Sequence, residues 1–181
     1  MYDNIERELK LLINEKVYNE LLHSYDFHNP ITQTNTYFDT ENQDVKKQRG
    51  AVRIRTIQDK KIFTLKIRKD EYTHYEFEKE ISAENINEIE DPEILNWFNQ
   101  YQIPKNLHPT ASFTTLRNVY AFENGELCLD KTYYKNHTDY EIEYEYTSDH
   151  DGIHFFNSIL EKYGLKWVKN CPGKIARALN D

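Results

Sequence analysis

The chain is poor in cysteine and has no long apolar run. Its 181 residues include two cysteines, Cys128 and Cys171, which form no C-x-x-C pair. Such usage is typical of reduced thiols in a cytosolic protein rather than of a disulfide-rich secreted domain. No stretch approaches the ~20 apolar residues of a membrane-spanning helix, and the N-terminus lacks the basic and then apolar pattern of a signal peptide. We therefore expect a cytoplasmic protein without a membrane partner.

Basic charge and glycine are also scarce. Lysine and arginine number 23 against 31 acidic residues, and the formal net charge is -8, which disfavours nucleic acid as the main partner. Only five glycines are present, and the sequence contains no P-loop motif, no G-x-G-x-x-G and no G-x-S-x-G. A bound phosphate is therefore not held by a P-loop or a Rossmann turn, and the nucleophile elbow of α/β-hydrolases is absent.

Strand-like segments make up most of what is present. Alternating or β-branched runs predict about eight strands, at Ile5–Ile13, Thr34–Phe38, Ala51–Ile57, Lys61–Lys69, Thr73–Ile81, Ser112–Glu123, Glu126–Tyr134 and Thr138–Tyr146. Apolar spacing and capping residues predict helices at Asn14–Ser24, within Asn85–Tyr101, from Asp151 to Tyr163 and from Lys174 to Leu179. Short strands joined by tight turns such as Asn124-Gly125 favour an antiparallel sheet or barrel. We therefore predict an α+β fold in a single domain over residues 1–181.

The charged residues of these strands lie on one face. Successive side chains of a strand point to opposite sides, so Glu6, Glu8 and Lys10 face one way and a mostly apolar set faces the other. Other strands repeat the pattern, with basic charges at Arg53, Arg55, Lys66 and Arg68 and acidic charges at Glu76, Glu78, Glu80, Glu141, Glu143 and Glu145. A solvated face explains one such strand, but like charges on one face repel unless something lies between the strands. The whole set therefore favours a closed barrel with a charged interior and helices over its apolar outside.

Such an interior predicts a particular ligand. Clustered carboxylates suit Mg²⁺ or Mn²⁺, and clustered Arg and Lys side chains suit phosphate. A barrel with both predicts a site for a metal-bound polyphosphate. The parity of the charges argues against a lipocalin-like binder of apolar ligands, whose interior would be apolar.

A series of motifs follows in order along the chain. They are E-x-E-x-K at Glu6, Glu8 and Lys10, Y-F-D within TNTYFDT, R-x-R at Arg53 and Arg55, T-L-K at Lys66, TLRNVY with Arg117, LCLDK with Asp130, YEIEYE, and PGKIARAL with Lys174. The ordered set resembles the CYTH-domain proteins, the triphosphate tunnel metalloenzymes, and is most similar to their Gram-positive bacterial branch. The resemblance implies an eight-stranded antiparallel β-barrel, or tunnel, with a charged interior and flanking helices, which binds a triphosphate and a divalent metal.

The resemblance also implies roles for individual residues. The metal ligands, for Mg²⁺ or Mn²⁺, would be Glu6, Glu8, Asp130, Glu141 and Glu143. The phosphate-binding residues would be Lys10, Arg53, Arg55, Lys66, Arg117 and Lys174. The residues closest to the chemistry would be Glu6, Glu8, Lys10 and Lys66.

Two of these assignments have alternatives in the sequence. The E-x-E element is either Glu141 with Glu143, which the spacing from Asp130 favours, or Glu143 with Glu145. Lys174 either binds phosphate or, like Arg177, is a solvated charge on a helix.

Two further groups of charged residues are open to more than one interpretation. Glu76 and Glu78 either line the tunnel or pair with Arg68 across strands. His150 and His154 lie at a turn and helix start with aspartates nearby, and we interpret that segment as helix capping rather than as a zinc site.

The resemblance favours hydrolysis of a small triphosphate, with inorganic triphosphate as the first choice. Two other enzymatic alternatives are a class IV-like adenylate cyclase and a thiamine triphosphatase. A non-catalytic sensor that binds a nucleotide or polyphosphate is an alternative of a different class. We expect a monomer or a homodimer.

Overall fold

Eight strands close into a single antiparallel barrel. The computed structural model describes residues 4–181, and the strands follow the order β1-β5-β4-β3-β2-β6-β7-β8 around the ring. They are β1 (Ile5–Ile13), β2 (Ile31–Asp39), β3 (Gly50–Ile57), β4 (Lys60–Arg68), β5 (Thr73–Ile81), β6 (His108–Ala121), β7 (Gly125–Tyr133) and β8 (Thr138–Tyr146). The predicted α+β fold with a closed antiparallel barrel is confirmed.

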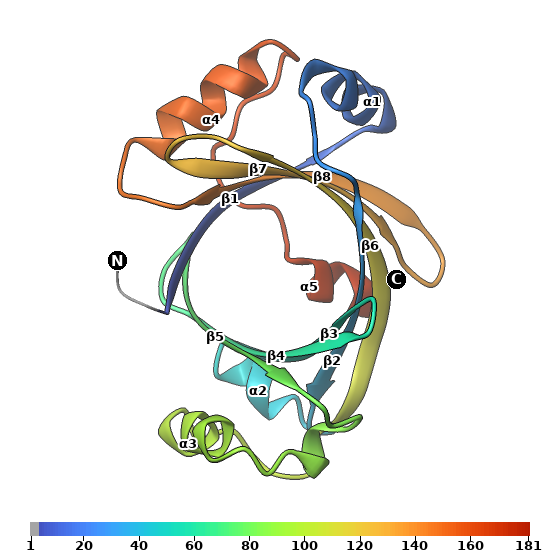
Figure 1. Cartoon of the computed structure of the whole chain (residues 1–181), viewed down its shortest axis with the longest axis vertical. Coiled ribbons are helices and arrows are strands. Elements are labelled where there is room, and N and C mark those ends of the chain that lie inside the picture. Colours follow the sequence, from blue (N-terminus) through green and yellow to red (C-terminus); the bar gives the residue numbers. More distant parts are fainter. Residues whose placement is uncertain (1–3) are drawn as a thin grey trace.

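The helices lie mostly outside the ring. They are α1 (Glu15–Ser24), α2 (Asp44–Lys47), α3 (Pro92–Gln100), α4 (Gly152–Glu161) and α5 (Lys174–Leu179), with one 3₁₀ turn, η1 (Ile86–Glu88). Figure 1 looks through the ring and shows α1 and α4 outside it on one side and α2 and α3 on the opposite side. The short α5 falls within the outline of the ring. No helix within residues 4–181 has both the length and the apolar character to span a membrane.

Side-chain caps mark where α1, α3 and α4 begin, and the cap of α4 at Asp151 is the one that the sequence predicted. The side chains of Asn14, Asp91 and Asp151 accept hydrogen bonds from backbone N–H groups in the first turns of α1, α3 and α4, which satisfies donors that have no partner within the helix. Gly164, just beyond α4, has a φ of +70°, which favours glycine. The predicted helix over Asp151–Tyr163 is slightly too long, because α4 is regular only over Gly152–Glu161.

The sequence did not reveal α2, because a helix of four residues has no apolar period. It depends on Asp39 at the end of β2, whose carboxylate accepts hydrogen bonds from the backbone N–H groups of Val45 (2.9 Å) and Lys46 (3.1 Å). The aspartate of the Y-F-D motif therefore supports a helix start here. The strand predicted over Ser112–Glu123 also differs, since β6 begins earlier, at His108, and pairs with β2 through an irregularity at Tyr37 and Phe38.

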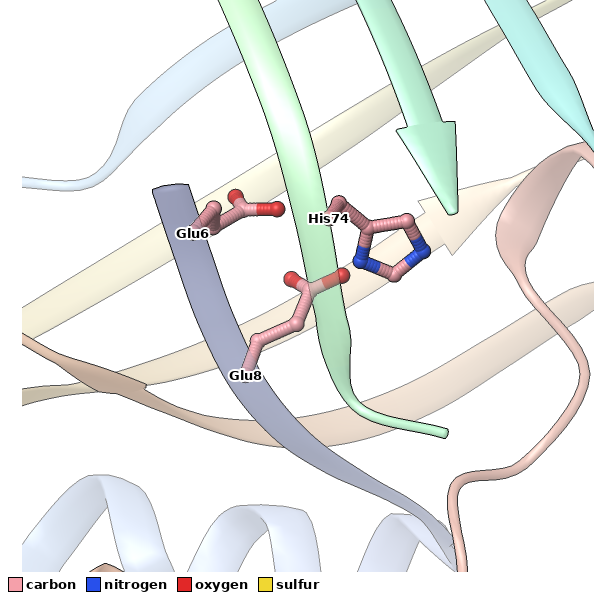
Figure 2. Close-up of side chains that lie close together, drawn as sticks. All are labelled: Glu6, Glu8 and His74. Carbon is pink, nitrogen blue, oxygen red and sulfur yellow. The ribbon is translucent and has the colours of Figure 1, made fainter. Parts of the chain in front are cut away.

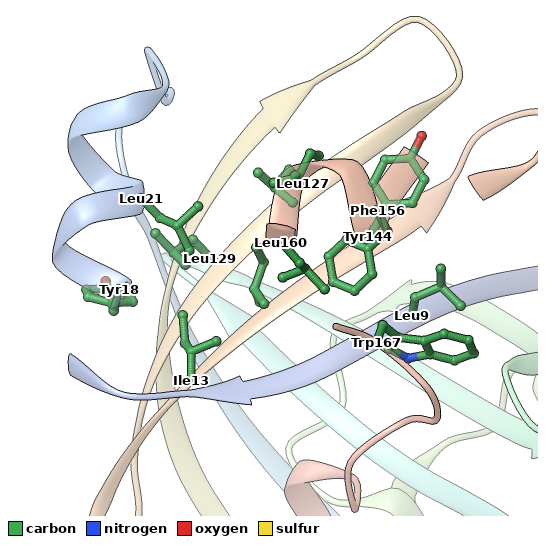
Figure 3. Packing of buried hydrophobic residues seen from close by; sticks show 12 residues of the cluster. Leu9, Ile13, Tyr18, Leu21, Leu127, Leu129, Tyr144, Phe156, Leu160 and Trp167 are labelled. Atoms are coloured by element: carbon green, nitrogen blue, oxygen red, sulfur yellow. The ribbon is translucent and has the colours of Figure 1, made fainter. Parts of the chain in front are cut away.

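Apolar side chains cover the outside of the barrel in two layers. One layer packs the outer faces of β1, β7 and β8 against α1 and α4, and Figure 3 shows part of it, including Leu9, Tyr144, Phe156 and Leu160. The other packs β3, β4 and β5 against α3, with Phe63 among its fully buried residues. Because these faces hold the apolar core, the opposite face of each strand is left for the charged side chains.

Candidate functional site

The interior of the barrel is a polar cavity of about 1060 Å³. Of the metal-binding and phosphate-binding residues that the resemblance implies, those lining it are Glu6, Glu8, Lys10, Arg53, Arg55, Lys66, Arg117, Glu143 and Lys174. Asp130 and Glu141 are fully buried and lie in contact with Lys174. The structure therefore gathers all the predicted site residues in one place, although they come from six strands and α5.

Two groups of ligand-type side chains form inside the cavity. The first, which we call the β1 cluster, contains Glu6, Glu8 and His74. The second, which we call the β8 cluster, contains Asp130, Glu141 and Glu143. In each cluster one ligand atom from every member lies within 4.8 Å of the others. Together the two clusters contain all the residues that the resemblance implies as metal ligands. His74 is a further member that the sequence analysis did not name.

Strand pairing builds the β1 cluster. Glu6 lies opposite His74 in the pairing of β1 with β5. The Lys66 ammonium contacts both carboxylates, with its Nζ 2.9 Å from Glu8 Oε1, and Lys10 Nζ lies 2.8 Å from the same oxygen. Burial, with the neighbouring Glu8 charge, raises the pKa of Glu6 to about 8. Burial also opposes ionisation of Glu8, but Lys10 and Lys66 hold its pKa well below the usual range.

His74 is the member of the β1 cluster that sequence reasoning missed. Its Nδ1 atom is buried and has no hydrogen-bond partner. Burial and the Lys66 charge lower its pKa to about 4, so the imidazole is neutral near pH 7. Figure 2 shows the ring beside the Glu6 and Glu8 carboxylates. A signal was present, because His74 shares its strand face with Glu76 and Glu78.

The β8 cluster is more completely enclosed by cations. Asp130 and Glu141 are fully buried, and Glu143 is 4% exposed. Arg117 donates two hydrogen bonds to Asp130 (2.8 and 2.7 Å) and one to Glu143 (2.7 Å). Burial opposes ionisation of both carboxylates, yet Arg117 and Lys174 lower the pKa values of Asp130 and Glu143. Asp130 and Glu143 are therefore ionised and largely neutralised by the protein itself, whereas burial raises the pKa of Glu141.

Helix α5 directs its basic residues into the cavity. Lys174 Nζ lies 2.8 Å from Asp130 and 2.5 Å from Glu141, and it also contacts Glu143. Arg177 contacts the Glu141 carboxylate at 2.7 Å, and it also contacts the carboxylate of Asp139 on β8. The alternative that these two residues are solvated helix charges is therefore wrong, because both are drawn to buried carboxylates.

The facing wall of the cavity is basic. Arg53 donates hydrogen bonds to Thr64 (2.9 Å) and Glu78 (3.2 Å), but its buried Nε has no partner. Arg55 donates to the side-chain oxygen of Asn35 (2.8 Å), and it forms no ion pair with any carboxylate in residues 4–181. Burial, with the nearby Arg53 charge, lowers the pKa of Arg55 to about 10. The Arg55 charge on this wall thus has no carboxylate partner among residues 4–181, and Arg53 keeps one unused donor.

The structure decides between the two interpretations of Glu76 and Glu78. Glu76 approaches Lys66 at 3.5 Å and Glu78 approaches Arg53, so both line the tunnel. Pairing with Arg68 is not observed, since its Nε donates instead to the Asp70 carbonyl.

His150 and His154 lie at the start of α4, which Asp151 caps as the sequence predicted. His150 forms a hydrogen bond with the Tyr144 hydroxyl (2.8 Å), and the His154 backbone N–H donates to the capping Asp151. Among residues 4–181 neither histidine belongs to a metal-type cluster. Cys128 and Cys171 are both free thiols.

The comparisons with known proteins agree with this architecture. One relative is the Bacillus subtilis protein YjbK, whose name describes it as a candidate triphosphatase. It is 28% identical over 174 residues, which cover 91% of this chain and 90% of the relative. A Bacillus halodurans structure described as a candidate adenylate cyclase is 29% identical, covers 96% of this chain and 97% of its own, and has a TM-score of 0.83.

A more distant neighbour supports the fold alone. It is a Hippeastrum adenylyl cyclase candidate, HpAC1, which is described as revealing a dominant triphosphatase activity. It is 22% identical and covers 98% of this chain and 95% of its own, with a TM-score of 0.77.

The family model for the CYTH domain matches residues 4–169. The match covers every strand of the barrel. It also agrees with the ordered motifs and with the charged cavity that they line. The chain therefore belongs to the CYTH family.

Proposed function

We propose that this protein hydrolyses a small triphosphate in its tunnel, with inorganic triphosphate as the substrate and Mg²⁺ or Mn²⁺ as the cofactor. The observation that carries the proposal is the basic wall of the cavity, where Arg55 has no carboxylate partner and the Arg53 Nε has no hydrogen-bond partner, and which faces two carboxylate clusters. Guanidinium groups with free donors suit phosphate oxygens. The name of the Bacillus subtilis relative supports the same chemistry.

The chain offers suitable ligands for a divalent ion. The β8 cluster presents carboxylates alone, which is the donor set that Mg²⁺ and Mn²⁺ prefer. Glu6 and Glu8 would hold a second ion. A divalent ion at these positions would neutralise phosphate oxygens and favour ionisation of a water molecule.

The basic side chains would position the substrate. Lys10, Lys66, Arg117 and Lys174 reach the cavity from four different elements and could contact phosphates from several sides. Phosphoryl transfer needs mainly in-line alignment and neutralisation of charge. Both effects are stronger when the groups are buried and already oriented, as these are. Release of the ammonium of Lys66 from Glu6 and Glu8 would free it for a phosphate oxygen.

Two other outcomes have some support. The description of the Bacillus halodurans structure as a candidate adenylate cyclase favours testing ATP. A thiamine triphosphatase is tested by adding thiamine triphosphate to the same assay as a third substrate, and a non-catalytic sensor would give no product from any of the three.

The test is metal-dependent phosphate release from tripolyphosphate and from ATP, each with Mg²⁺ and with Mn²⁺. We expect phosphate and pyrophosphate from tripolyphosphate. The variant Glu6→Gln/Glu8→Gln should lose roughly 100-fold or more of this activity. A control with two exposed glutamates changed, Glu41→Gln/Glu161→Gln, should keep it.

Other results would contradict the proposal in distinct ways. Cyclic AMP from ATP without phosphate from tripolyphosphate would identify a cyclase. No turnover, with a higher melting temperature in tripolyphosphate and Mg²⁺, would identify a sensor.

A further inference from the structure

The β1 cluster differs from a purely acidic site because one of its members is an imidazole. His74 lies directly across from Glu6 in the β1–β5 ladder, and a ring nitrogen shares the 4.8 Å grouping with a carboxylate oxygen from each of Glu6 and Glu8. Figure 2 shows one ring nitrogen turned toward the Glu8 carboxylate. The geometry brings three potential ligands to one point from two paired strands.

The buried nitrogen of His74 has no partner within the protein. Its Nδ1 is shielded from solvent and forms no hydrogen bond in residues 4–181. A buried polar atom of this kind is uncommon in native proteins and calls for an explanation. An imidazole has two ring nitrogens, and its neutral form offers a lone pair on one of them to a metal ion.

The charges around the cluster leave a place for a cation. Lys66 and Lys10 contact the two carboxylates but neither is hydrogen-bonded to His74. An ammonium group is a donor on a flexible four-carbon chain, so it can move to another acceptor. A metal ion in its place would satisfy the carboxylates and the imidazole nitrogen together.

We propose that His74 is a third, nitrogen ligand of the metal ion held by Glu6 and Glu8, and that it makes this position favour a first-row transition ion such as Mn²⁺ over Mg²⁺. Imidazole binds transition ions in preference to Mg²⁺, whereas an oxygen-only donor set like the β8 cluster discriminates less between them. The inference rests on the proposed function in taking Glu6 and Glu8 as metal ligands.

Pulsed electron paramagnetic resonance on the protein loaded with Mn²⁺ tests this directly. A coordinated imidazole gives nitrogen hyperfine modulation, and carboxylates and water give none. We expect the modulation in the unsubstituted protein, its loss in His74→Gln, and its retention in His154→Gln, which changes an exposed histidine on α4. Absence from the unsubstituted protein, or persistence in His74→Gln, would overturn the proposal.

Metal titrations give a second readout. His74→Gln should weaken Mn²⁺ binding at this position roughly tenfold or more, while Mg²⁺ binding should change much less. Equal changes for the two ions would contradict the proposed selectivity. If His74→Gln does not fold, His74→Asn takes its place, and absence of the modulation from the unsubstituted protein would still overturn the proposal.

These outcomes are separable from the failure of the proposed function. Metal-dependent hydrolysis without nitrogen modulation would support the proposed hydrolase activity and exclude His74 as a metal ligand. Nitrogen modulation that depends on His74, in a protein without turnover, would support the metal site and exclude the hydrolase activity.

Discussion

The β1 and β8 clusters are built alike but are neutralised differently. Each brings three ligand atoms within 4.8 Å of one another inside the same barrel. Arg117, Lys174 and Arg177 contact the β8 cluster, and every member of it is at most 4% exposed. The β1 cluster is contacted by two lysines, leaves a His74 nitrogen without a partner, and has one glutamate whose pKa is raised to about 8.

The difference follows from the kind of cation. The Arg117 guanidinium binds Asp130 through two parallel hydrogen bonds, and arginine stays charged at all ordinary pH values. A lysine ammonium is a point charge on a flexible chain. The β8 cluster is therefore part of what holds the barrel together, whereas the β1 cluster is better suited to exchange its cations.

The largest effect is expected where a buried carboxylate loses its guanidinium. Arg117→Ala would leave the fully buried Asp130 with Lys174 as its remaining cation. We expect the free energy of unfolding to fall by about 3–5 kcal/mol, because removing one partner of a buried ion pair is costly. Urea denaturation measures this. Arg7→Ala, which removes a surface pair with the exposed Asp149, should change stability by less than about 1 kcal/mol. An equal loss of unfolding free energy in Arg117→Ala and Arg7→Ala would mean that the β8 cluster has no structural role.

A smaller effect distinguishes the two possible E-x-E pairs. Glu141 lies in the β8 cluster, whereas Glu145 lies on the same strand face, opposite Glu8. Glu141→Gln should weaken Mn²⁺ binding roughly tenfold or more, and Glu145→Gln should have a much smaller effect. Calorimetric titration of the two matched variants, each first shown to be folded by circular dichroism, makes the comparison. A larger loss of Mn²⁺ affinity in Glu145→Gln than in Glu141→Gln would assign the metal to Glu143 and Glu145.

The smallest effect is a pH dependence of the metal-free protein, measured in EDTA. The folded state holds the Glu6 proton up to about pH 8, whereas the unfolded chain releases it near 4.5, so stability falls as pH rises between these values. His74, whose pKa is lowered from 6.5 to about 4, has the opposite effect below pH 6.5. The decline should therefore be visible from pH 6.5 to 8, at about 1–2 kcal/mol.

Glu6→Gln should remove most of that decline. Glu145, whose pKa is raised to about 7, accounts for a remainder confined to the lower part of the range. Asp130 and Glu143 of the β8 cluster should have no part in it, since their pKa values are lowered and their stabilisation is lost only in acid. Glu141, whose pKa is raised by burial, acts in the same direction as Glu6. Chemical denaturation at several pH values supplies the measurement, and a stability that rises with pH in the unsubstituted protein would contradict the assignment.

Much of the barrel was predictable because its signals are local. The alternation in residues 5–13, 73–81 and 138–146 predicted β1, β5 and β8 with the bounds that the structure has. The same parity placed the charged residues on one face, and closure made that face the interior. The short α2 was not predictable, because it depends on the Asp39 carboxylate rather than on a repeat of its own.

The sequence by itself determined the strands, their charged faces and, through the order of the motifs, the family. Each of these depends on the spacing of residues along the chain. Only the tertiary structure decided that Lys174 and Arg177 turn inward, that Arg117 neutralises the β8 cluster, and that His74 joins Glu6 and Glu8. Those contacts join residues far apart in sequence, and their energies come from burial and from distances that arise only when the barrel closes.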